Sequence, residues 1–165
     1  MQLLNVLRQV DIFYELSQEQ LQKLVSVCAE TSYKEGDIIV RENTPSDEIF
    51  VIVQGTVDIV LDPSLLGKTG SAEPEPVTIV TLWPGQTFGE VGLVDRGMRS
   101  ASARAASDDT KLLAVTRDNL QNLCQEDYQM GYILMRNIAS DLAFKIRHTD
   151  LMLREQLFWE ARPKA

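Results

Sequence analysis

Histidine and cysteine are scarce in this sequence of 165 residues, which contains one of the former and two of the latter. Metal centres built from imidazole ligands need several histidines, and nucleophilic triads need a histidine beside a serine or a cysteine. His148 has no second histidine to join it, and it lies in a segment with helical spacing. We therefore predict that the protein is not an enzyme and that it binds no metal ion.

The two cysteines, Cys28 and Cys124, are far apart in the sequence, and neither belongs to a Cys-x-x-Cys pair. Both lie among apolar residues with helical spacing, which indicates buried free thiols and not a disulfide or a metal site. Free thiols are typical of a reducing compartment, so we expect a cytoplasmic protein. A signal peptide and a membrane segment are not expected either, because the sequence has no apolar run of the necessary length.

Basic residues are outnumbered, with 16 Lys and Arg against 24 Asp and Glu and a net charge of -8. Such a chain repels duplex DNA, so we expect no direct binding of nucleic acid. A small anion needs only one well-placed arginine, and the net charge does not exclude it. The length and a hydrophobic content of 44% suit a single domain with a proper core over residues 1–165.

Helical and strand-like stretches follow one another in three blocks. Residues 1–32 form an N-terminal helical segment, with apolar residues at helical spacing over 3–13 and a second helix capped by Ser17, with Gln20 in the capping-box position. Residues 117–160 are helical again, with a short helix over 117–123 behind a Thr116 cap and a long one over about 127–159.

The middle block, residues 33–116, has the composition of short strands. Stretches rich in Val and Ile are separated by turn residues, and Gln54–Gly55 is a candidate two-residue hairpin. The polar segment 62–76 predicts a loop on a further hairpin. The predicted strands cover residues 37–41, 48–53, 56–61, 77–83, 101–106 and 110–115.

The long helix has more apolar surface than one contact needs. One stripe follows spacings of three and four, and a second apolar set widens the face. We expect one side to pack on the strands and the stripe to pair with its copy in a homodimer; the alternative is that the whole face packs on its own domain. The stripe is Tyr132, Met135, Ala139, Leu142, Ile146, Thr149, Leu153 and Gln156, and the second set is Ile133, Ile138, Phe144, Leu151, Leu157 and Phe158.

The segment 88–102, FGEVGLVDRGMRSAS, contains the parts of a site for a compact, phosphorylated, sugar-bearing ligand. Its Gly89–Glu90 pair can open a short helix. Glycine lets the backbone approach a ligand closely, and free amides at a helix start attract phosphate. A guanidinium such as that of Arg99 binds two phosphate oxygens at once. A carboxylate such as that of Glu90 accepts a hydrogen bond from a sugar hydroxyl.

This segment resembles the phosphate-binding cassette of cyclic nucleotide-binding domains in its F-G-E-V-G-L and R-S-A-S stretches. The stretches Y-K-E-G-D at 33–37 and F-V-I-V-Q-G-T-V at 50–57 resemble two further motifs of that family, and the similarity covers about residues 10–155. The resemblance implies an α+β fold: an eight-stranded antiparallel β-roll over 33–116, flanked by N-terminal helices and a long C-terminal helix. Residues 117–160 would be the hinge and lid helices, the latter also serving dimerisation.

The resemblance also implies the roles of the site residues. Arg99 would pair with the cyclic phosphate, and Glu90 would accept the ribose 2′-hydroxyl. Ser100 would donate its hydroxyl to the phosphate. Thr149 would read the adenine amino group, or else be a small residue tolerated at a helix–helix contact. The predicted site also includes Phe88, Ala101 and the backbone of Gly89, Val91 and Gly92.

Two residues depart from the family pattern. Met98 occupies a position where the family often has proline, and Ser46 replaces a common turn glycine. Some family members keep the fold without binding a nucleotide. The presence of both Glu90 and Arg99 argues against that state here.

The predicted function is a regulatory domain that senses a cyclic nucleotide and moves its C-terminal helix on binding. Cyclic AMP is the first choice of ligand, and cyclic GMP or a cyclic dinucleotide stays open. A haem is not expected, because His148, Cys28 and Cys124 lie outside the cassette. Beyond the ligand no cofactor is expected, and the signal would pass to an output protein or to an attached effector module. The alternative is a nucleotide-free dimerisation or interaction module of the same fold.

Overall fold

The structure is a computed structural model, and it describes residues 2–62 and 76–160. The helices are α1 (Gln2–Leu7), the 3-10 helix η1 (Asp11–Phe13), α2 (Gln18–Val27), α3 (Glu90–Asp95), α4 (Arg117–Glu126) and α5 (Tyr128–Glu160). The strands are β1 (Ala29–Tyr33), β2 (Ile38–Val40), β3 (Glu48–Gln54), β4 (Val57–Leu61), β5 (Val77–Leu82), β6 (Thr87–Phe88), β7 (Ser102–Ala105) and β8 (Thr110–Thr116).

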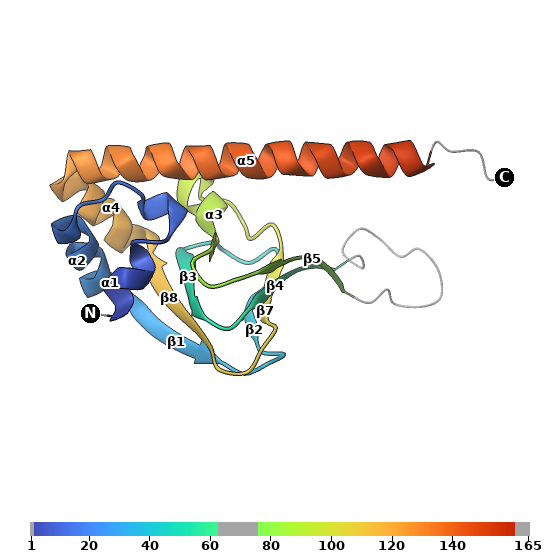
Figure 1. Ribbon diagram of the computed structural model, residues 1–165, viewed down its shortest axis with the longest axis horizontal. Helices are drawn as coiled ribbons and strands as arrows, with labels where there is room; N and C mark the ends of the chain where they lie inside the picture. Colours follow the sequence, from blue (N-terminus) through green and yellow to red (C-terminus); the bar gives the residue numbers. More distant parts are fainter. Residues whose placement is uncertain (1, 63–75, 161–165) are drawn as a thin grey trace.

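Within the described residues, the eight strands form two four-stranded sheets in the orders β1-β8-β3-β6 and β2-β7-β4-β5. Every neighbouring pair is antiparallel. Figure 1 shows helices α1, α2 and α4 gathered at one end of the roll and α5 running across it. The predicted α+β fold, an eight-stranded antiparallel β-roll with N-terminal helices and a long C-terminal helix, is confirmed.

The predicted hairpin at Gln54–Gly55 is wrong. Strand β3 pairs with β6 and β8, and β4 pairs with β5 and β7, so the turn at Gly55 carries the chain from one sheet to the other. Gly55 has a φ of 78°, and a Cβ there would lie 2.6 Å from Thr110 Oγ1. The second predicted hairpin is confirmed, since β4 and β5 pair from Val57 with Leu82 to Leu61 with Val77. Of its predicted loop, residues 63–75 lie outside the described residues.

The predicted helix over 3–13 is broken into α1 and η1. Val10 and Ile12 are both buried, with 1% of each exposed. Residues two apart lie on nearly opposite sides of an α-helix, so a continuous helix would bury only one of them. The break turns both side chains into the core.

Two strands were absent from the prediction. Strand β1 begins at Ala29, inside the segment expected to be helical, and pairs along its whole length with β8. Strand β6 has two residues and pairs with β3. The cap of α2 is confirmed: Ser17 Oγ accepts a hydrogen bond from the Gln20 amide, and Gln20 Oε1 accepts one from the Ser17 amide. Thr116 caps α4 as predicted, through the amide of Asn119.

Strands β3 and β8 are buried on both faces and divide the core into two clusters. One face packs under the helices through Ile49, Val51 and neighbouring residues of β8. The other face fills the inside of the roll with Phe50 and Ile52. Because both strands are covered on both sides, their sequences read as continuous apolar runs without polar alternation.

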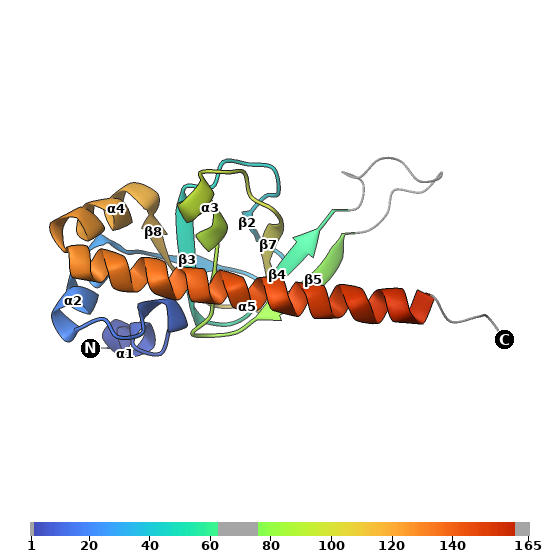
Figure 2. The same ribbon diagram turned by 90° about the horizontal axis from the view of Figure 1, so that it is seen from above.

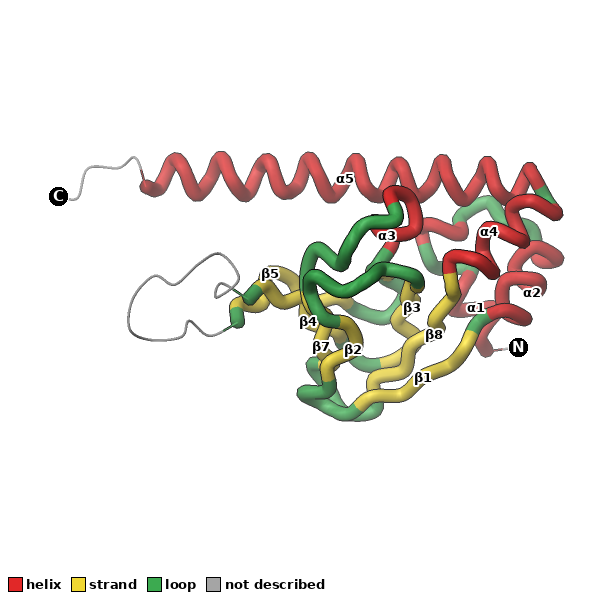
Figure 3. Tube along the Cα trace, turned by 180° about the vertical axis from the view of Figure 1, so that it is seen from behind, coloured by secondary structure: helices red, strands yellow, loops and turns green. Residues whose placement is uncertain are grey.

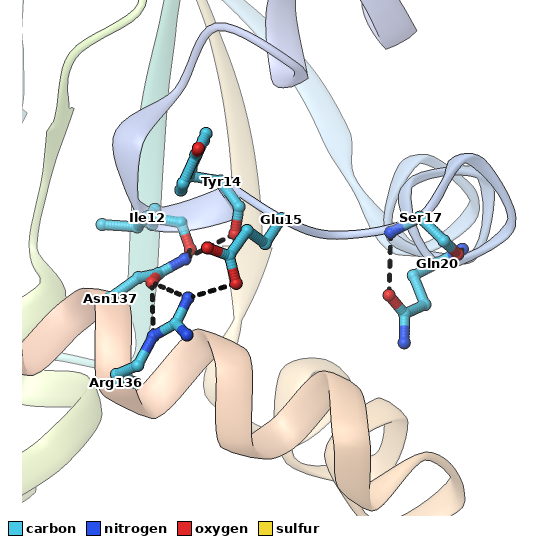
Figure 4. A network of polar contacts seen from close by, with 7 residues as sticks. All are labelled: Ile12, Tyr14, Glu15, Ser17, Gln20, Arg136 and Asn137. Atoms are coloured by element: carbon cyan, nitrogen blue, oxygen red, sulfur yellow. Dashed lines mark hydrogen bonds and ion pairs between the residues drawn. The ribbon is translucent and has the colours of Figure 1, made fainter.

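The first part of α5 is fixed to the helical end of the domain. Met130, Leu134 and Ile138 are buried against it. Figure 4 shows Asn137 Nδ2 donating hydrogen bonds to the carbonyl oxygens of Ile12, at 3.3 Å, and Tyr14, at 2.7 Å. The same figure shows Arg136 paired with Glu15, with Nη2 and Oε2 2.9 Å apart, and the hydrogen bond from the Ser17 amide to Gln20 Oε1 at the start of α2. The contacts of Asn137 and Arg136 hold α5 against the loop that follows η1.

The second part of α5 runs on past α3, as the views from above and from behind show (Figures 2 and 3). The alternative in which its whole apolar face packs on its own domain is wrong, because Phe144, Ile146 and Leu151 are more than half exposed. Of the predicted stripe, Tyr132, Met135 and Leu153 are exposed as well. No helix in the described part of the chain is long and apolar enough to cross a membrane.

Candidate ligand-binding site

The cassette is a short helix enclosed by two left-handed residues. Strand β6 ends at Phe88, and Gly89 then adopts a φ of 87° as the N-cap of α3. Arg96, with a φ of 55°, ends the helix, and Asp95 accepts a hydrogen bond from the Gly97 amide. The predicted helix start at the Gly-Glu pair is confirmed. After this turn the chain returns to the loop before β3, where the Arg99 amide donates to the Thr44 carbonyl oxygen and the Arg99 carbonyl oxygen accepts from the Asn43 amide.

Glycine is required at two cassette positions because other atoms lie where a side chain would begin. A Cβ at Gly89 would lie 2.4 Å from Arg99 Nη1 and 2.7 Å from the Glu48 carbonyl oxygen. A Cβ at Gly92 would lie 1.9 Å from Ser46 Oγ. The two glycines therefore let the cassette lie directly against Arg99 and against the loop before β3.

Arg99 is a buried cation whose bonding capacity is only partly used. The residue is 6% exposed. Its guanidinium donates from Nη1 to the Glu48 carbonyl oxygen at 2.9 Å and lies 5.6 Å from the Phe50 ring centroid. Its Nε is buried and has no hydrogen-bond partner among the described residues. Burial lowers the pKa of Arg99, and the carboxylates of Glu48, Asp47 and Glu90 oppose this effect. An arginine remains protonated at neutral pH under such a shift.

Glu90 is the buried anion of the same cassette. It is 4% exposed, and its Oε1 accepts a hydrogen bond from Lys145 Nζ on α5 at 2.7 Å. Its Oε2 is buried with no partner in the described part of the chain. Native proteins pair nearly all buried polar atoms, so an unpaired Nε and an unpaired Oε2 in one cassette indicate a site that a polar ligand completes. The pair offers a donor to an anion and an acceptor to a hydroxyl.

Comparison with known proteins agrees with this geometry. The cyclic nucleotide-binding domain family matches residues 30–127. The chain belongs to this family. A cGMP-dependent protein kinase of Drosophila melanogaster is 33% identical over 119 residues, which make up 72% of this chain but 15% of that kinase. The cyclic AMP receptor protein of Thermus thermophilus is 30% identical over 151 residues, covering 92% of this chain and 64% of that protein.

The solved structures agree on the fold. The crystal structure of the Thermus thermophilus catabolite activator protein superimposes with a TM-score of 0.71 and 28% identity, and the match covers 90% of this chain and 63% of that one. The β-roll with its terminal helices is thus the cyclic nucleotide-binding fold.

The other predicted residues of this cyclic nucleotide-binding domain lie in different surroundings. Phe88 is buried in the roll and stacks on Phe50 with ring centroids 5.0 Å apart, so its side chain supports the cassette from inside. The Val91 side chain is 39% exposed. Ser100 is exposed and Ala101 is half-buried. The carbonyl oxygen of Gly92 accepts a hydrogen bond from Arg117, the first residue of α4, at 2.6 Å.

Thr149 is exposed, and its hydroxyl donates to the Lys145 carbonyl oxygen at 2.9 Å. Asp141, Lys145 and Thr149 are spaced by four residues and therefore share one face of α5. Lys145 binds the cassette, so this face is the one that α5 turns toward the site. Lys145 was not among the predicted site residues. The one signal in the sequence was the Asp141–Lys145 spacing, which does not identify Glu90 as a third partner.

Apolar side chains line the inner face of the second sheet. Ile59 pairs with Val80 on one side and with Ala103 on the other. Val80 shares its strand face with Leu82, which is buried in the roll, yet Val80 is 46% exposed. The neighbouring Leu82 belongs to the core, and Trp83 is 61% exposed.

A cavity of about 480 Å³ adjoins Arg99 on the side of β2. Asp47 and Glu48 contribute to its lining, and among the predicted site residues only Arg99 does. Two carboxylates in a lining repel a phosphate. We therefore do not assign the anion site to this cavity.

Proposed function

We propose that this domain is a cyclic nucleotide sensor, with Arg99 binding the cyclic phosphate and Glu90 the ribose 2′-hydroxyl. The observation that carries the proposal is the pair of buried, unpartnered atoms, Arg99 Nε and Glu90 Oε2, in one cassette. A cyclic nucleotide has an anionic phosphate and a neighbouring hydroxyl, which complement this donor and this acceptor. Backbone amides of Gly89, Val91 and Gly92, together with Ser100 and Ala101, would complete the phosphate contacts.

Cyclic AMP is the preferred ligand within this proposal. The match to the cyclic AMP receptor protein covers most of this chain, and a serine at position 100 is compatible with cyclic AMP as well as with cyclic GMP. Relatives named cGMP-dependent protein kinases match as well, but the chain spans only 15–17% of their length. Their kinase activity is therefore not transferred to this chain, and we propose binding without catalysis.

The signal would leave the site through α5. This helix contacts the cassette at Lys145, and Thr149 lies one turn further along the same face, where it would meet the base. A ligand shifts the helix only as far as it binds the two arrangements unequally. The exposed stripe of α5 would pair two copies into a homodimer, and an output protein or attached module would receive the movement. The free thiols of Cys28 and Cys124 are half-buried, not buried as predicted; partial burial raises their pKa values, and free thiols suit the cytoplasm.

The test is a thermal-shift and calorimetric titration with cyclic AMP, cyclic GMP, cyclic dinucleotides and linear 5′-AMP. A ligand at a hundredfold excess over its Kd stabilises the folded state by about 2.7 kcal/mol. We expect cyclic AMP to give the largest shift and 5′-AMP none, because the linear phosphate cannot adopt the ring geometry. No shift with any cyclic compound up to millimolar concentration would contradict the proposal and favour the nucleotide-free interaction module.

A further inference from the structure

Lys145 joins the long C-terminal helix to the cassette. Its Nζ lies 2.7 Å from Glu90 Oε1 and 2.9 Å from Asp141 Oδ2. The Glu90 side chain is 5% exposed and that of Lys145 is 41% exposed, so the lysine covers the carboxylate from the solvent side. No other ion pair to Glu90 is present in the described part of the chain.

A buried carboxylate needs such a partner in order to remain ionised. Desolvation disfavours the charged form strongly, and a nearby cation reverses this effect. Burial lowers the pKa of Lys145, but the charge and the hydrogen bonds of Glu90 and Asp141 outweigh it and raise the pKa overall. Lys145 therefore keeps its proton, and its cation lies against the Glu90 carboxylate.

The lysine uses only one oxygen of the carboxylate. Oε1 accepts the lysine proton, and Oε2 is buried without a partner in the described residues. An ionised carboxylate with one oxygen fixed has a defined orientation, and the second oxygen is free to accept from a hydroxyl. Lys145 also offsets a negative charge that would otherwise repel an anionic ligand at this end of the site.

We infer that Lys145 is a positioning residue of the ligand site, which fixes the Glu90 carboxylate through Oε1 and so leaves Oε2 for the sugar hydroxyl of the ligand. This inference rests on the proposed function. It makes α5 part of the site before any ligand arrives. Because Lys145 acts through Glu90, its effect depends on whether the ligand carries the hydroxyl.

A double-mutant cycle between Lys145 and the ligand hydroxyl tests this inference. Calorimetry measures the affinity of wild-type protein and of K145Q for cyclic AMP and for 2′-deoxy cyclic AMP. We expect the wild-type protein to prefer cyclic AMP by about tenfold, as for a charge-assisted hydrogen bond. In K145Q the affinity for cyclic AMP falls by about tenfold and the preference falls toward one. K145R keeps the cation and restores the preference.

The matched control is Arg147→Gln, which removes an exposed cation two residues along α5 and should leave both affinities within about twofold of wild type. Urea unfolding checks the fold of each variant, and Lys145→Met, which keeps the apolar stem, replaces K145Q if that variant is unstable. A preference that survives the loss of Lys145 overturns the inference while the proposed function stands. If the wild-type protein binds neither compound, the proposed function fails and the inference falls with it.

Discussion

Gly89 lies so close to Arg99 that the space for a side chain at position 89 is occupied by the guanidinium. A Cβ at Gly89 would be 2.4 Å from Arg99 Nη1, which donates to the Glu48 carbonyl oxygen. That carbonyl oxygen would also lie 2.7 Å from the Cβ, and as a backbone atom of β3 it cannot rotate away. The glycine of the cassette thus sets the position of the cation, in addition to supplying the left-handed turn.

We predict that Gly89→Ala lowers both stability and ligand affinity. A left-handed alanine costs about 1–2 kcal/mol, and the overpacking adds about 1–3 kcal/mol. Displacement of Arg99 weakens cyclic nucleotide binding by about tenfold or more. Urea unfolding and calorimetry measure the two effects.

The matched control is Gly85→Ala. Gly85 has nearly the same φ, 88°, but a Cβ there would meet nothing within 4 Å. This variant should therefore show the dihedral cost alone and keep its affinity. Equal losses of stability in the two variants would show that the contact with Arg99 is not tight in solution.

Gly92 and Ser46 form a second close contact, and a double-mutant cycle between these two residues can test it. Gly92 lies in a helix with an ordinary φ, so alanine is disfavoured there chiefly by the contact with the Ser46 side chain; the Ser46 carbonyl oxygen, 3.1 Å from the Cβ position, adds a smaller contact. We predict that Gly92→Ala destabilises the protein by about 1–3 kcal/mol. Ser46→Gly removes both atoms that clash, and the double variant should regain much of the loss. Additive losses in urea unfolding would contradict this steric account.

The cassette was predictable because its information is local. The glycine, the carboxylate, the short helix and the arginine lie within fifteen residues, and α3 begins at the residue where the pattern indicated. The caps at Ser17 and Thr116 depend on residues three apart and were predictable for the same reason.

The errors arose where a distant partner decides the structure. Strand β1 reads AETSY, which has no apolar alternation, and its pairing with β8 makes it a strand. The turn at Gly55 has the composition of a hairpin, but the strands that pair with β3 and β4 lie elsewhere in the sequence. Lys145 is 55 residues from Glu90, and no pattern within its helix indicates that contact.

Arg99→Met separates function from stability. We predict a loss of ligand affinity of at least about tenfold, because the anion loses its charge-assisted partner. The free energy of unfolding without ligand should fall by no more than about 1 kcal/mol, since a buried cation with an unpaired Nε contributes little to stability. Calorimetry and urea unfolding test the two halves. A loss of several kcal/mol would mean that Arg99 serves the fold and not the site.

Asp127 links the stability of the helical end to pH. Its carboxylate accepts hydrogen bonds from the Gln20 side chain, at 2.9 Å, and from the Met130 amide, at 2.9 Å, and these bonds lower its pKa. Because the pKa of Asp127 is lower in the folded state than in the unfolded state, where it is about 3.9, its ionisation stabilises the protein at pH values above about 3.9. This contribution disappears as the pH falls through the pKa of the folded state.

We therefore predict that Asp127→Asn has a lower Tm than wild type at pH 7 and that the difference shrinks below about pH 4. Asp127→Ala cannot accept from the Met130 amide in any state, so its deficit should persist in acid. Thermal unfolding monitored by circular dichroism between pH 3 and pH 7 gives all three curves. A difference between wild type and Asp127→Asn that is constant with pH would contradict the assignment.

The exposed stripe of α5 predicts the oligomeric state. Ile146 and Leu153 are 63% and 53% exposed although both are large and apolar, and they lie two turns apart on one face. We expect the wild-type protein to sediment as a dimer at micromolar concentration and the double variant Ile146→Glu/Leu153→Glu to sediment as a monomer, because charges at a helix–helix seam oppose pairing.

The control Arg147→Glu/Arg154→Glu changes exposed residues beside the stripe and should remain dimeric. The monomeric variant should unfold at the same urea concentration at low protein concentration, since neither side chain packs on the domain. If the wild-type protein sediments as a monomer at every concentration, up to about 100-fold above micromolar, the stripe has no role in signalling. The contact between Lys145 and Glu90 then remains as the route from the cassette to α5.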